Sequence, residues 1–391
     1  MRVLLFTGKG GVGKTTTAAA TAVLAASRGL KTLVLSTDPA HSLADALAVP
    51  LGSEPTSVDT GLDAMQVDSQ GAFERSWREV QDYLRAVLER AGMDALQADE
   101  LTVLPGAEEV LALLELRQQV ASGRYDLVVV DCAPTGETLR LLALPEALAW
   151  YVEKVFPAHR RALRAVRPLL SRVTEVPEKG VFEAVARLHR DLAEVRAVLT
   201  APTTSVRLVL TPEAVVVAEA RRTLTSLALY GYRVDGLVAN RVMAPSADPW
   251  VAGWVAAQRT QLEAVRADAA PLSVRESPYA AAEPVGLDAL LALGEVVYGD
   301  TDPTEVLATD ELLTVARADR GFLLSLSLPL ARLEDLGLSR SGDDLVITVA
   351  GHRRLLALPS ALRRCDVAGA TLASGRLVVR FEPDPAQWRT T

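Results

Sequence analysis

Cysteine is scarce in this chain, whose 391 residues include only Cys132 and Cys365. Two cysteines supply neither a disulfide framework nor a cysteine-based metal site within one chain. No uninterrupted apolar run approaches the roughly 18–20 residues that a membrane-spanning helix needs. We also expect no signal peptide, because the first predicted strand begins at residue 2 or 3. These absences favour a cytoplasmic protein without a transmembrane segment.

Positive charge is also in short supply. The net charge is −8 and the isoelectric point is near 5.3, which argues against nucleic acid as the main partner. Short basic clusters such as Arg160-Arg161 and Arg353-Arg354 are not interleaved with aromatic residues. Solvated helix faces or turns explain them, and we expect no nucleic-acid binding.

Apolar residues, in contrast, make up 49% of the chain, enough for large buried cores. Several apolar runs are continuous rather than alternating, as is typical of strands buried on both faces of a parallel sheet. Each is followed by a polar or glycine-rich loop and a helical pattern. We therefore predict an α/β domain with a mostly parallel sheet over residues 1–298. The clearest predicted strands lie at residues 31–36, 127–130, 207–210 and 236–239.

Two segments of this domain, at about 68–122 and 143–200, contain helical patterns without strands and are predicted to be helical insertions. The second contains an apolar stripe at helical spacing, and Pro157 and Pro168 break or kink its helices. The stripe either packs onto the sheet or other helices, or lines an exposed groove for an apolar ligand or peptide. Its residues are Leu144, Leu148, Tyr151, Val152, Val155 and Phe156.

The hydrophobic period changes to two near the C-terminus. Apolar residues alternate from Phe322 to Leu328, from Leu345 to Val349 and from Leu377 to Phe381. Turn residues at 341–344 and 374–375 separate these three runs. We predict a small antiparallel β-sandwich over 319–385. A linker with a short helix, over 299–318, is expected to connect it to the first domain.

The most informative motif is a phosphate loop placed between a strand and a helix. A G-x-x-x-x-G-K-[ST] loop in this context directs backbone N–H groups and a helix N-terminus at phosphate oxygens. Lys14 is expected to reach the β- and γ-phosphates, and the Thr15 hydroxyl to bind Mg²⁺. A G-x-G-x-x-G dinucleotide motif also fits, but it gives Lys14 and Thr15 no role. The motif comprises Gly8, Lys9, Gly10, Gly11, Val12, Gly13, Lys14 and Thr15.

Two carboxylates follow predicted strands, where an α/β sheet places its ligands. Asp131 ends one strand and is predicted to lie on the Mg²⁺ side of the site, through water. Asp38 ends another and is predicted to orient or deprotonate the water that attacks the γ-phosphate. Lys9 is either a solvated loop charge or a cation that reaches a neighbouring subunit's phosphates, as an arginine finger does.

Several motifs together resemble those of the arsenite-efflux ATPase and of the cytosolic ATPase that targets tail-anchored membrane proteins, a family with a deviant Walker A loop. The resemblance implies a homodimer that hydrolyses ATP with Mg²⁺. It makes Lys9 the intersubunit lysine and Asp38 the catalytic carboxylate, and it adds Thr16, Glu213 and Asn240 to the nucleotide contacts, with the Asn240 amide reading adenine. The C-terminal segment resembles an α-crystallin fold. The motifs are GKGGVGKTT (8–16), STDPAHSL (36–43), LPGAEE (104–109), DCAPTGETLRLL (131–142), LTPE (210–213) and VANRV (238–242).

This chain lacks both the cysteine cluster of the arsenite pumps and the zinc-binding CxxC of many targeting factors. The leading hypothesis is therefore a dimeric ATPase switch that binds and releases a hydrophobic protein segment, with a possible transient membrane-complex partner. The catalytic subunit of an arsenite or anion efflux pump is an alternative. A regulatory scaffold ATPase that acts through its β-domain is another.

Overall fold

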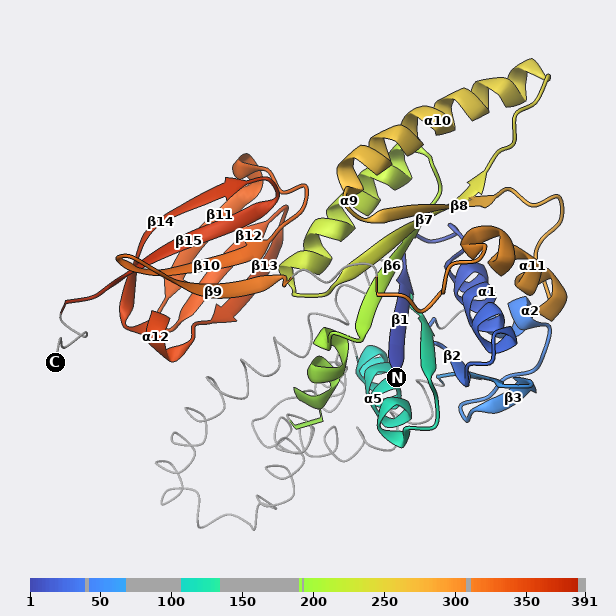
Figure 1. Cartoon of the computed structure of the whole chain (residues 1–391), viewed down its shortest axis with the longest axis horizontal. Helices are drawn as coiled ribbons and strands as arrows, with labels where there is room; N and C mark the ends of the chain where they lie inside the picture. Colours follow the sequence, from blue (N-terminus) through green and yellow to red (C-terminus); the bar gives the residue numbers. More distant parts are fainter. Residues whose placement is uncertain (39–41, 68–106, 134–189, 192, 307–310, 386–391) are drawn as a thin grey trace, which may run out of the picture.

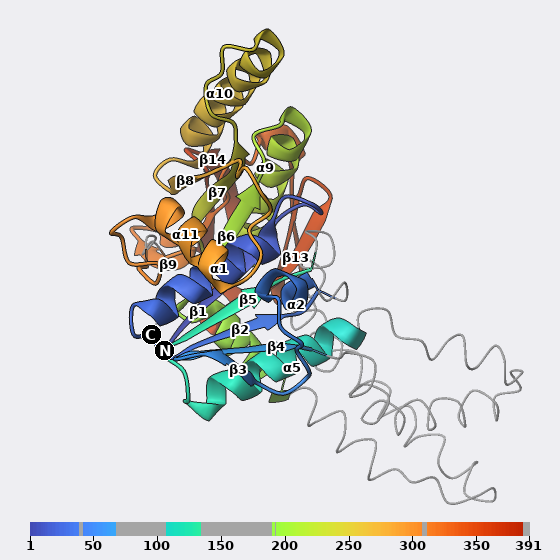
Figure 2. The ribbon, with the colours of Figure 1, turned by 90° about the vertical axis from the view of Figure 1, so that its right-hand side faces the viewer.

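The computed structural model describes residues 1–38, 42–67, 107–133, 190–191, 193–306 and 311–385. They form a central sheet with helices on both faces, and a separate β-domain beside it (Figure 1). The helices α1 and α11 pack against each other on one face of the sheet, and α9 covers part of the other (Figures 1 and 2). This layered arrangement confirms the predicted α/β class. The helices of this part are α1 (Lys14–Ser27), α2 (Ser42–Leu47), α5 (Ala107–Ser122), α9 (Ala214–Leu229), α10 (Pro249–Ala269) and α11 (Leu287–Tyr298).

The central sheet has eight strands in the order β3-β4-β2-β5-β1-β6-β7-β8. All neighbours pair in parallel except β3 and β4, which are antiparallel. Because β1 lies between β5 and β6, later strands of the chain add to the sheet on both sides of β1. The carboxyl end of β1 therefore lies at a switch point, where such sheets bind ligands. The strands are β1 (Arg2–Thr7), β2 (Thr32–Ser36), β3 (Thr56–Asp59), β4 (Leu62–Gln66), β5 (Leu127–Asp131), β6 (Thr204–Leu210), β7 (Val234–Val242) and β8 (Ser273–Pro278).

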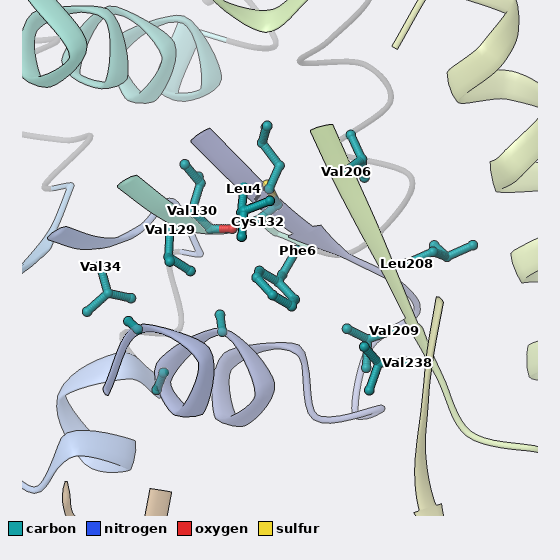
Figure 3. Close-up of a cluster of buried hydrophobic side chains, with 14 of the residues drawn as sticks. Leu4, Phe6, Val34, Val129, Val130, Cys132, Val206, Leu208, Val209 and Val238 are labelled. Carbon is teal, nitrogen blue, oxygen red and sulfur yellow. Dashed lines mark hydrogen bonds between the residues drawn. The ribbon is translucent and has the colours of Figure 1, made fainter. Parts of the chain in front are cut away.

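The inner strands are buried along their whole length. Every residue of β1, β2, β5 and β6 is buried, as the continuous apolar runs predicted. Figure 3 shows how side chains of these strands meet above α1, with Phe6 pointing toward the helix and Cys132 among apolar neighbours. The sequence pattern missed three strands of this sheet. Two of them, β3 and β8, have mostly exposed or half-exposed residues and so lack an apolar run, and the third, β4, is mostly buried but is interrupted by Asp63.

The β-domain consists of a four-stranded sheet, β14-β15-β10-β9, and a three-stranded sheet, β11-β12-β13, with antiparallel pairing in both. The alternating residues predicted for its core are buried, among them Leu324, Ile347 and Phe381, except Phe322, which is half-buried and packs against this core. Its elements are β9 (Leu313–Ala318), β10 (Gly321–Ser327), η2 (Leu333–Asp335), β11 (Leu336–Ser341), β12 (Asp344–Val349), β13 (His352–Ala357), α12 (Ser360–Arg363), β14 (Cys365–Ala373) and β15 (Arg376–Pro383).

The predicted linker over 299–318 is too long. Its last six residues form β9, an edge strand that pairs with β10 and belongs to the β-domain. The sequence pattern missed this strand because most of its residues are exposed, including Leu313 and Val315, so that no buried face shows as alternation.

The β-domain is docked on the C-terminal half of α9. Leu229, the last residue of that helix, is fully buried in the β-domain core. Arg354 of β13 donates a hydrogen bond to the Leu229 carbonyl at 2.6 Å, and Thr225 donates one to the Pro329 carbonyl at 2.6 Å. A cation at a helix C-terminus satisfies carbonyls that the helix leaves unpaired. The helix α9 therefore runs from the carboxyl end of β6 to the β-domain (Figure 1).

The helical insertions are described only in part. The helix α5 lies in the first predicted insertion, and residues 193–200 at the end of the second are helical. The apolar stripe between Leu144 and Phe156 lies outside the described residues, as does most of the loop that follows Ala133. Within the described ranges, no helix is both long and apolar enough to cross a membrane.

Candidate nucleotide site

The predicted phosphate loop connects the carboxyl end of β1 to the first residue of α1, as the motif requires. Gly8 approaches the backbone of Val209 on β6 so closely that a Cβ would overlap its carbonyl. Gly13 has a φ of 90° and is the N-cap of α1, and a Cβ there would overlap the side chain of Asn240. These two positions require glycine for physical reasons, and the loop leaves the N-terminal N–H groups of α1 without a side-chain cap.

Lys14 and Thr15 begin α1. Lys14 is almost fully buried, and its Nζ donates to the carbonyl of Lys9 at 3.4 Å, so the ammonium lies back along its own loop. The Thr15 hydroxyl lies 3.0 Å from the hydroxyl of Ser42, the first residue of α2. This contact ties the phosphate loop to the segment that follows β2. Thr16 is the next residue of α1 and is half-buried.

The carboxyl ends of β2 and β5 bring Ser36 and Asp131 opposite each other in register. The Ser36 hydroxyl donates to Oδ2 of Asp131 at 3.1 Å and accepts from the backbone N–H of Asp38 at 3.3 Å. One serine thus links the two acidic residues that the sequence placed at this edge. Asp38 is half-buried, and residues 39–41, which follow it, lie outside the described residues.

Asp131 is completely buried, and burial raises the pKa of its carboxyl to about 6, although the hydroxyls of Thr15 and Ser36 and the ammonium of Lys14 oppose the shift. Its Oδ1 atom has no hydrogen-bond partner among the described residues. A buried carboxylate oxygen beside the Thr15 hydroxyl fits the oxygen-rich surroundings that Mg²⁺ and its bound waters prefer. The residues present therefore suit the predicted ion.

Lys9 lies in the middle of the loop and differs from Lys14 in its surroundings. Its side chain is 39% exposed, and its ammonium lies 3.5 Å from Oε2 of Glu219 on α9, whose side chain is 29% exposed. The neighbouring glycines, Gly10 and Gly11, are exposed. Lys9 thus faces the surface of the molecule, whereas Lys14 faces its own loop.

Asn240 lies near the end of β7, directly beside the loop. Its Nδ2 donates to the carbonyl of Val12 at 2.9 Å, and its Oδ1 accepts from the backbone N–H of Arg241 at 2.9 Å. The expected contact of this amide with adenine stays a prediction. The contact with Val12 was not predicted, and it makes Asn240 a support for the loop itself.

Glu213 is the N-cap residue of α9 and is exposed, and its side chain does not cap the helix. It follows the carboxyl end of β6, the strand whose Val209 touches Gly8. The two cysteines take no part in this arrangement as nucleophiles: both are buried, and burial raises the pKa of the Cys132 thiol well above its ordinary value.

Ser36 and Ser42 are the site residues that sequence reasoning overlooked. Both were part of a recognised motif, but a serine is common in loops and helix caps, so its residue type gives no signal. A register argument could have found Ser36, since two parallel strands that end at Ser36 and Asp131 place these side chains at one edge.

Comparison with known proteins favours the phosphate-loop interpretation over the dinucleotide-binding one. The family model for anion-transporting ATPases matches residues 1–299, and a model for the HSP20-like domain found in the same family matches residues 319–381. The chain belongs to the ArsA ATPase family. It is therefore an ATP-hydrolysing enzyme whose ATPase domain is followed by an HSP20-like β-domain.

Some relatives match nearly the full length of the chain, and others match about two thirds of it. An uncharacterized protein of Streptomyces coelicolor is 42% identical, over 99% of each chain. A putative arsenical pump-driving ATPase of Chlorobaculum tepidum is 35% identical, over 98% of this chain and 96% of its own. The ATPase GET3 of Chaetomium globosum is 30% identical, over 63% of this chain and 74% of its own. The name of the Chlorobaculum tepidum relative corresponds to the arsenite branch of the resemblance seen in the sequence motifs.

Proposed function

We propose that this ArsA-family chain is a Mg²⁺-dependent ATPase that works as a homodimer and uses ATP binding and hydrolysis to change its affinity for a hydrophobic protein segment. The observation that carries the proposal is that two lysines of one loop point in different directions. Lys14 is buried against its own loop, whereas Lys9 faces outward and pairs only loosely with Glu219. A cation that faces outward from a phosphate loop is placed to act on a neighbouring subunit.

In this proposal the loop residues from Gly8 to Thr16 bind the phosphates through backbone N–H groups, and Lys14 neutralises their charge. Thr15, and Asp131 through water, would hold Mg²⁺, which would supply positive charge to the phosphate oxygens. Asp38 orients the attacking water and accepts its proton, and Ser36 holds Asp38 near Asp131. Glu213 and Asn240 complete the nucleotide contacts.

Lys9 is the residue that acts on the nucleotide of the partner subunit in this proposal. As charge develops on the transferred phosphoryl group, an ammonium from the opposite copy stabilises it, as an arginine finger does. The apolar stripe from Leu144 to Phe156 follows the loop after Asp131 in the sequence. A shift of that loop on ATP binding would therefore be passed on to the stripe, which we propose as the client-binding surface.

A pump-driving role is the second candidate, and the printed name of the Chlorobaculum tepidum relative favours it. Both cysteines of this chain are buried, one in each domain, so any response to a metalloid would have to pass through other residues or another subunit. Arsenite that stimulates ATP hydrolysis by the purified chain would favour this role over the client switch.

The proposal is tested with three substitutions in the phosphate site. Lys14→Ala should abolish nucleotide binding or hydrolysis, and Asp38→Asn should retain ATP and lose turnover. Lys9→Ala should keep nucleotide affinity within about twofold and lower kcat by roughly 10²-fold or more. Lys31→Ala, which removes an exposed lysine at the opposite end of the sheet, is the matched control and should behave as the native protein.

Client binding is measured with the Asp38→Asn protein. An apolar helical peptide should bind more tightly in ATP than in ADP or without nucleotide. Aspartates at Leu148 and Val152 should abolish that binding and leave the melting temperature unchanged. Equal affinity in all three nucleotide states would rule out the switch, because a ligand without differential affinity shifts no equilibrium. Turnover by Asp38→Asn at the native rate would rule out the catalytic assignment.

A further inference from the structure

The helix α10 carries an apolar surface that the proposed chemistry does not use. Its first nine residues, 249–257, contain no charged side chain, and most of them are exposed. Trp250 is 68% exposed and Trp254 is 43% exposed, and the buried residues of the helix begin only at Gln258. Figure 1 shows this half of α10 extending away from the sheet. We call residues 249–257 the tryptophan end of α10.

The tryptophan end is a well-ordered surface rather than a frayed terminus. Asp248 caps the helix by accepting from the N–H groups of Trp250 and Val251, at 2.9 and 3.0 Å. The two indoles lie one turn apart on the same face, with ring centroids 6.2 Å apart in an edge-to-face arrangement. Two preorganised tryptophans on a projecting, uncharged helix mark a protein contact site.

We propose that the tryptophan end of α10 is a contact between two copies of this chain, and that it supports the dimer in which Lys9 acts. The inference rests on the proposed homodimer and names the surface that holds it together. The position of α10 supports it, because the helix follows the carboxyl end of β7, the strand whose Asn240 supports the phosphate loop. Two copies that face each other across their phosphate loops would bring these ends of α10 toward one another.

The charge pattern also favours a second copy as the occupant. A two-fold contact places each patch against the same patch of its partner, so any charge there would meet its own sign. The tryptophan end avoids this repulsion because it has no charge between Asp248 and Arg259.

The area supports the same occupant. A fully buried tryptophan buries about 150–250 Å², and Trp250 and Trp254 are 68% and 43% exposed, so the four of them would newly bury about 330–560 Å² across a two-fold contact. A stable interface of ordinary size needs about 1,200–2,000 Å² in total. The tryptophans would thus supply roughly a quarter of such an interface, and the exposed loop around Lys9 would lie in the rest.

The test replaces both tryptophans by glutamate. A glutamate at position 250 lies in the first turn of α10, where a negative charge stabilises the helix, so the fold should be retained. Trp250→Glu/Trp254→Glu should weaken self-association in ATP by 10²-fold or more by analytical ultracentrifugation. Its ATPase activity should be low in dilute protein and should approach the native value as protein concentration rises. Leu333→Glu, at a 72% exposed leucine of η2, is the matched control and should associate normally.

A cross-linking experiment gives an independent measurement on protein with both tryptophans intact. Gly253 lies between them, and a Cβ there would meet no atom within 4 Å. Gly253→Cys should form a disulfide between two copies under mild oxidation in ATP. Gly52→Cys, at another open glycine remote from α10, should not.

The outcomes separate this inference from the proposed function. A native protein that stays monomeric in ATP at all concentrations would overturn the homodimer itself. A native dimer whose association is unchanged by the two glutamates, and which Gly253→Cys does not cross-link, would overturn only the tryptophan contact. An unchanged dimer that loses binding to an apolar peptide or to lipid vesicles would assign the tryptophan end to another partner and would equally overturn the inference.

Discussion

The ammonium of Lys9 lies 3.5 Å from the carboxylate of Glu219 and joins the phosphate loop to the second turn of α9. Both side chains are about one third exposed, so solvent screens the pair, and it contributes at most about 1 kcal/mol. Such a pair is weak enough to break when a phosphate charge competes for the ammonium. In the proposed dimer, Glu219 therefore holds Lys9 on its own subunit until a partner's nucleotide attracts it.

We expect Glu219→Gln to release Lys9 and to favour association of the two copies. The protein concentration at half-maximal ATPase activity should fall by up to about fivefold, the ratio that corresponds to about 1 kcal/mol. The kcat at saturating protein should stay within twofold of native. Glu263→Gln, an exposed carboxylate of α10, is the control and should leave both values unchanged. A lower kcat at saturating protein would mean that Glu219 orients Lys9 for catalysis rather than restraining it.

Asn240 supports the phosphate loop through the Val12 carbonyl, so its substitution should weaken nucleotide binding before it affects turnover. Asn240→Ala removes the hydrogen bond to the Val12 carbonyl, worth about 1 kcal/mol, together with the one from the Arg241 N–H, and should raise the Kd for ATP roughly fivefold to tenfold by isothermal titration calorimetry. Asn240→Asp keeps the shape but places a carboxylate beside a carbonyl and near bound phosphates, so its effect should be larger. Equal affinities in the native protein and both variants would contradict the supporting role.

The parts of the fold that the sequence predicted are those where burial imposes a strong pattern. The runs that became β1, β5 and β6 are buried on both faces and need continuous apolar residues, and the β-domain core alternates because only one face of each strand is buried. The strand β9 shows neither pattern because it is an exposed edge. Propensity and periodicity cannot detect a strand that is held mainly by backbone pairing to its neighbour.

The residues of the candidate site also differ in how far the sequence could predict them. The phosphate loop, Asp38 and Asp131 were predicted because their residue types and positions at strand ends are tied to the chemistry of phosphate and metal binding. The hydrogen bond from Ser36 to Asp131 joins residues 95 apart, and that from Asn240 to Val12 joins residues 228 apart. Such pairings depend on sheet order, and a single sequence gives no sheet order directly.

The buried contact between Arg354 and the Leu229 carbonyl should anchor the β-domain on α9. Arg354→Met keeps the length of the side chain but leaves the helix C-terminus without its cation, which we expect to cost about 2 kcal/mol. Urea unfolding should show this loss. Arg353→Met removes the exposed neighbour and should leave the free energy of unfolding within about 0.5 kcal/mol of native. Similar losses from the two variants would contradict an anchoring role for Arg354.

The buried carboxyl of Asp131 should make the stability of the metal-free protein depend on pH. Its pKa is raised to about 6, whereas an aspartate in an unfolded chain titrates near 3.9. Between these values the folded state binds more protons than the unfolded state, so the free energy of unfolding falls as pH rises from about 4 to 7. The contribution of this group to the fall is about 3 kcal/mol, at 1.36 kcal/mol for each pH unit of the shift.

Asp131→Asn removes this titration and keeps the shape of the side chain. In EDTA, the free energy of unfolding of the variant should rise relative to that of the native protein as pH increases from 4 to 8, by up to about 3 kcal/mol. Urea unfolding at each pH measures this difference. Asp319→Asn, an exposed aspartate of the β-domain, should show no such trend. Adding Mg²⁺ and ATP at pH 8 should stabilise the native protein more than the Asp131→Asn variant, because the variant lacks the carboxylate charge. A stability difference between variant and native protein that stays constant from pH 4 to 8 would mean that Asp131 titrates normally in the folded chain.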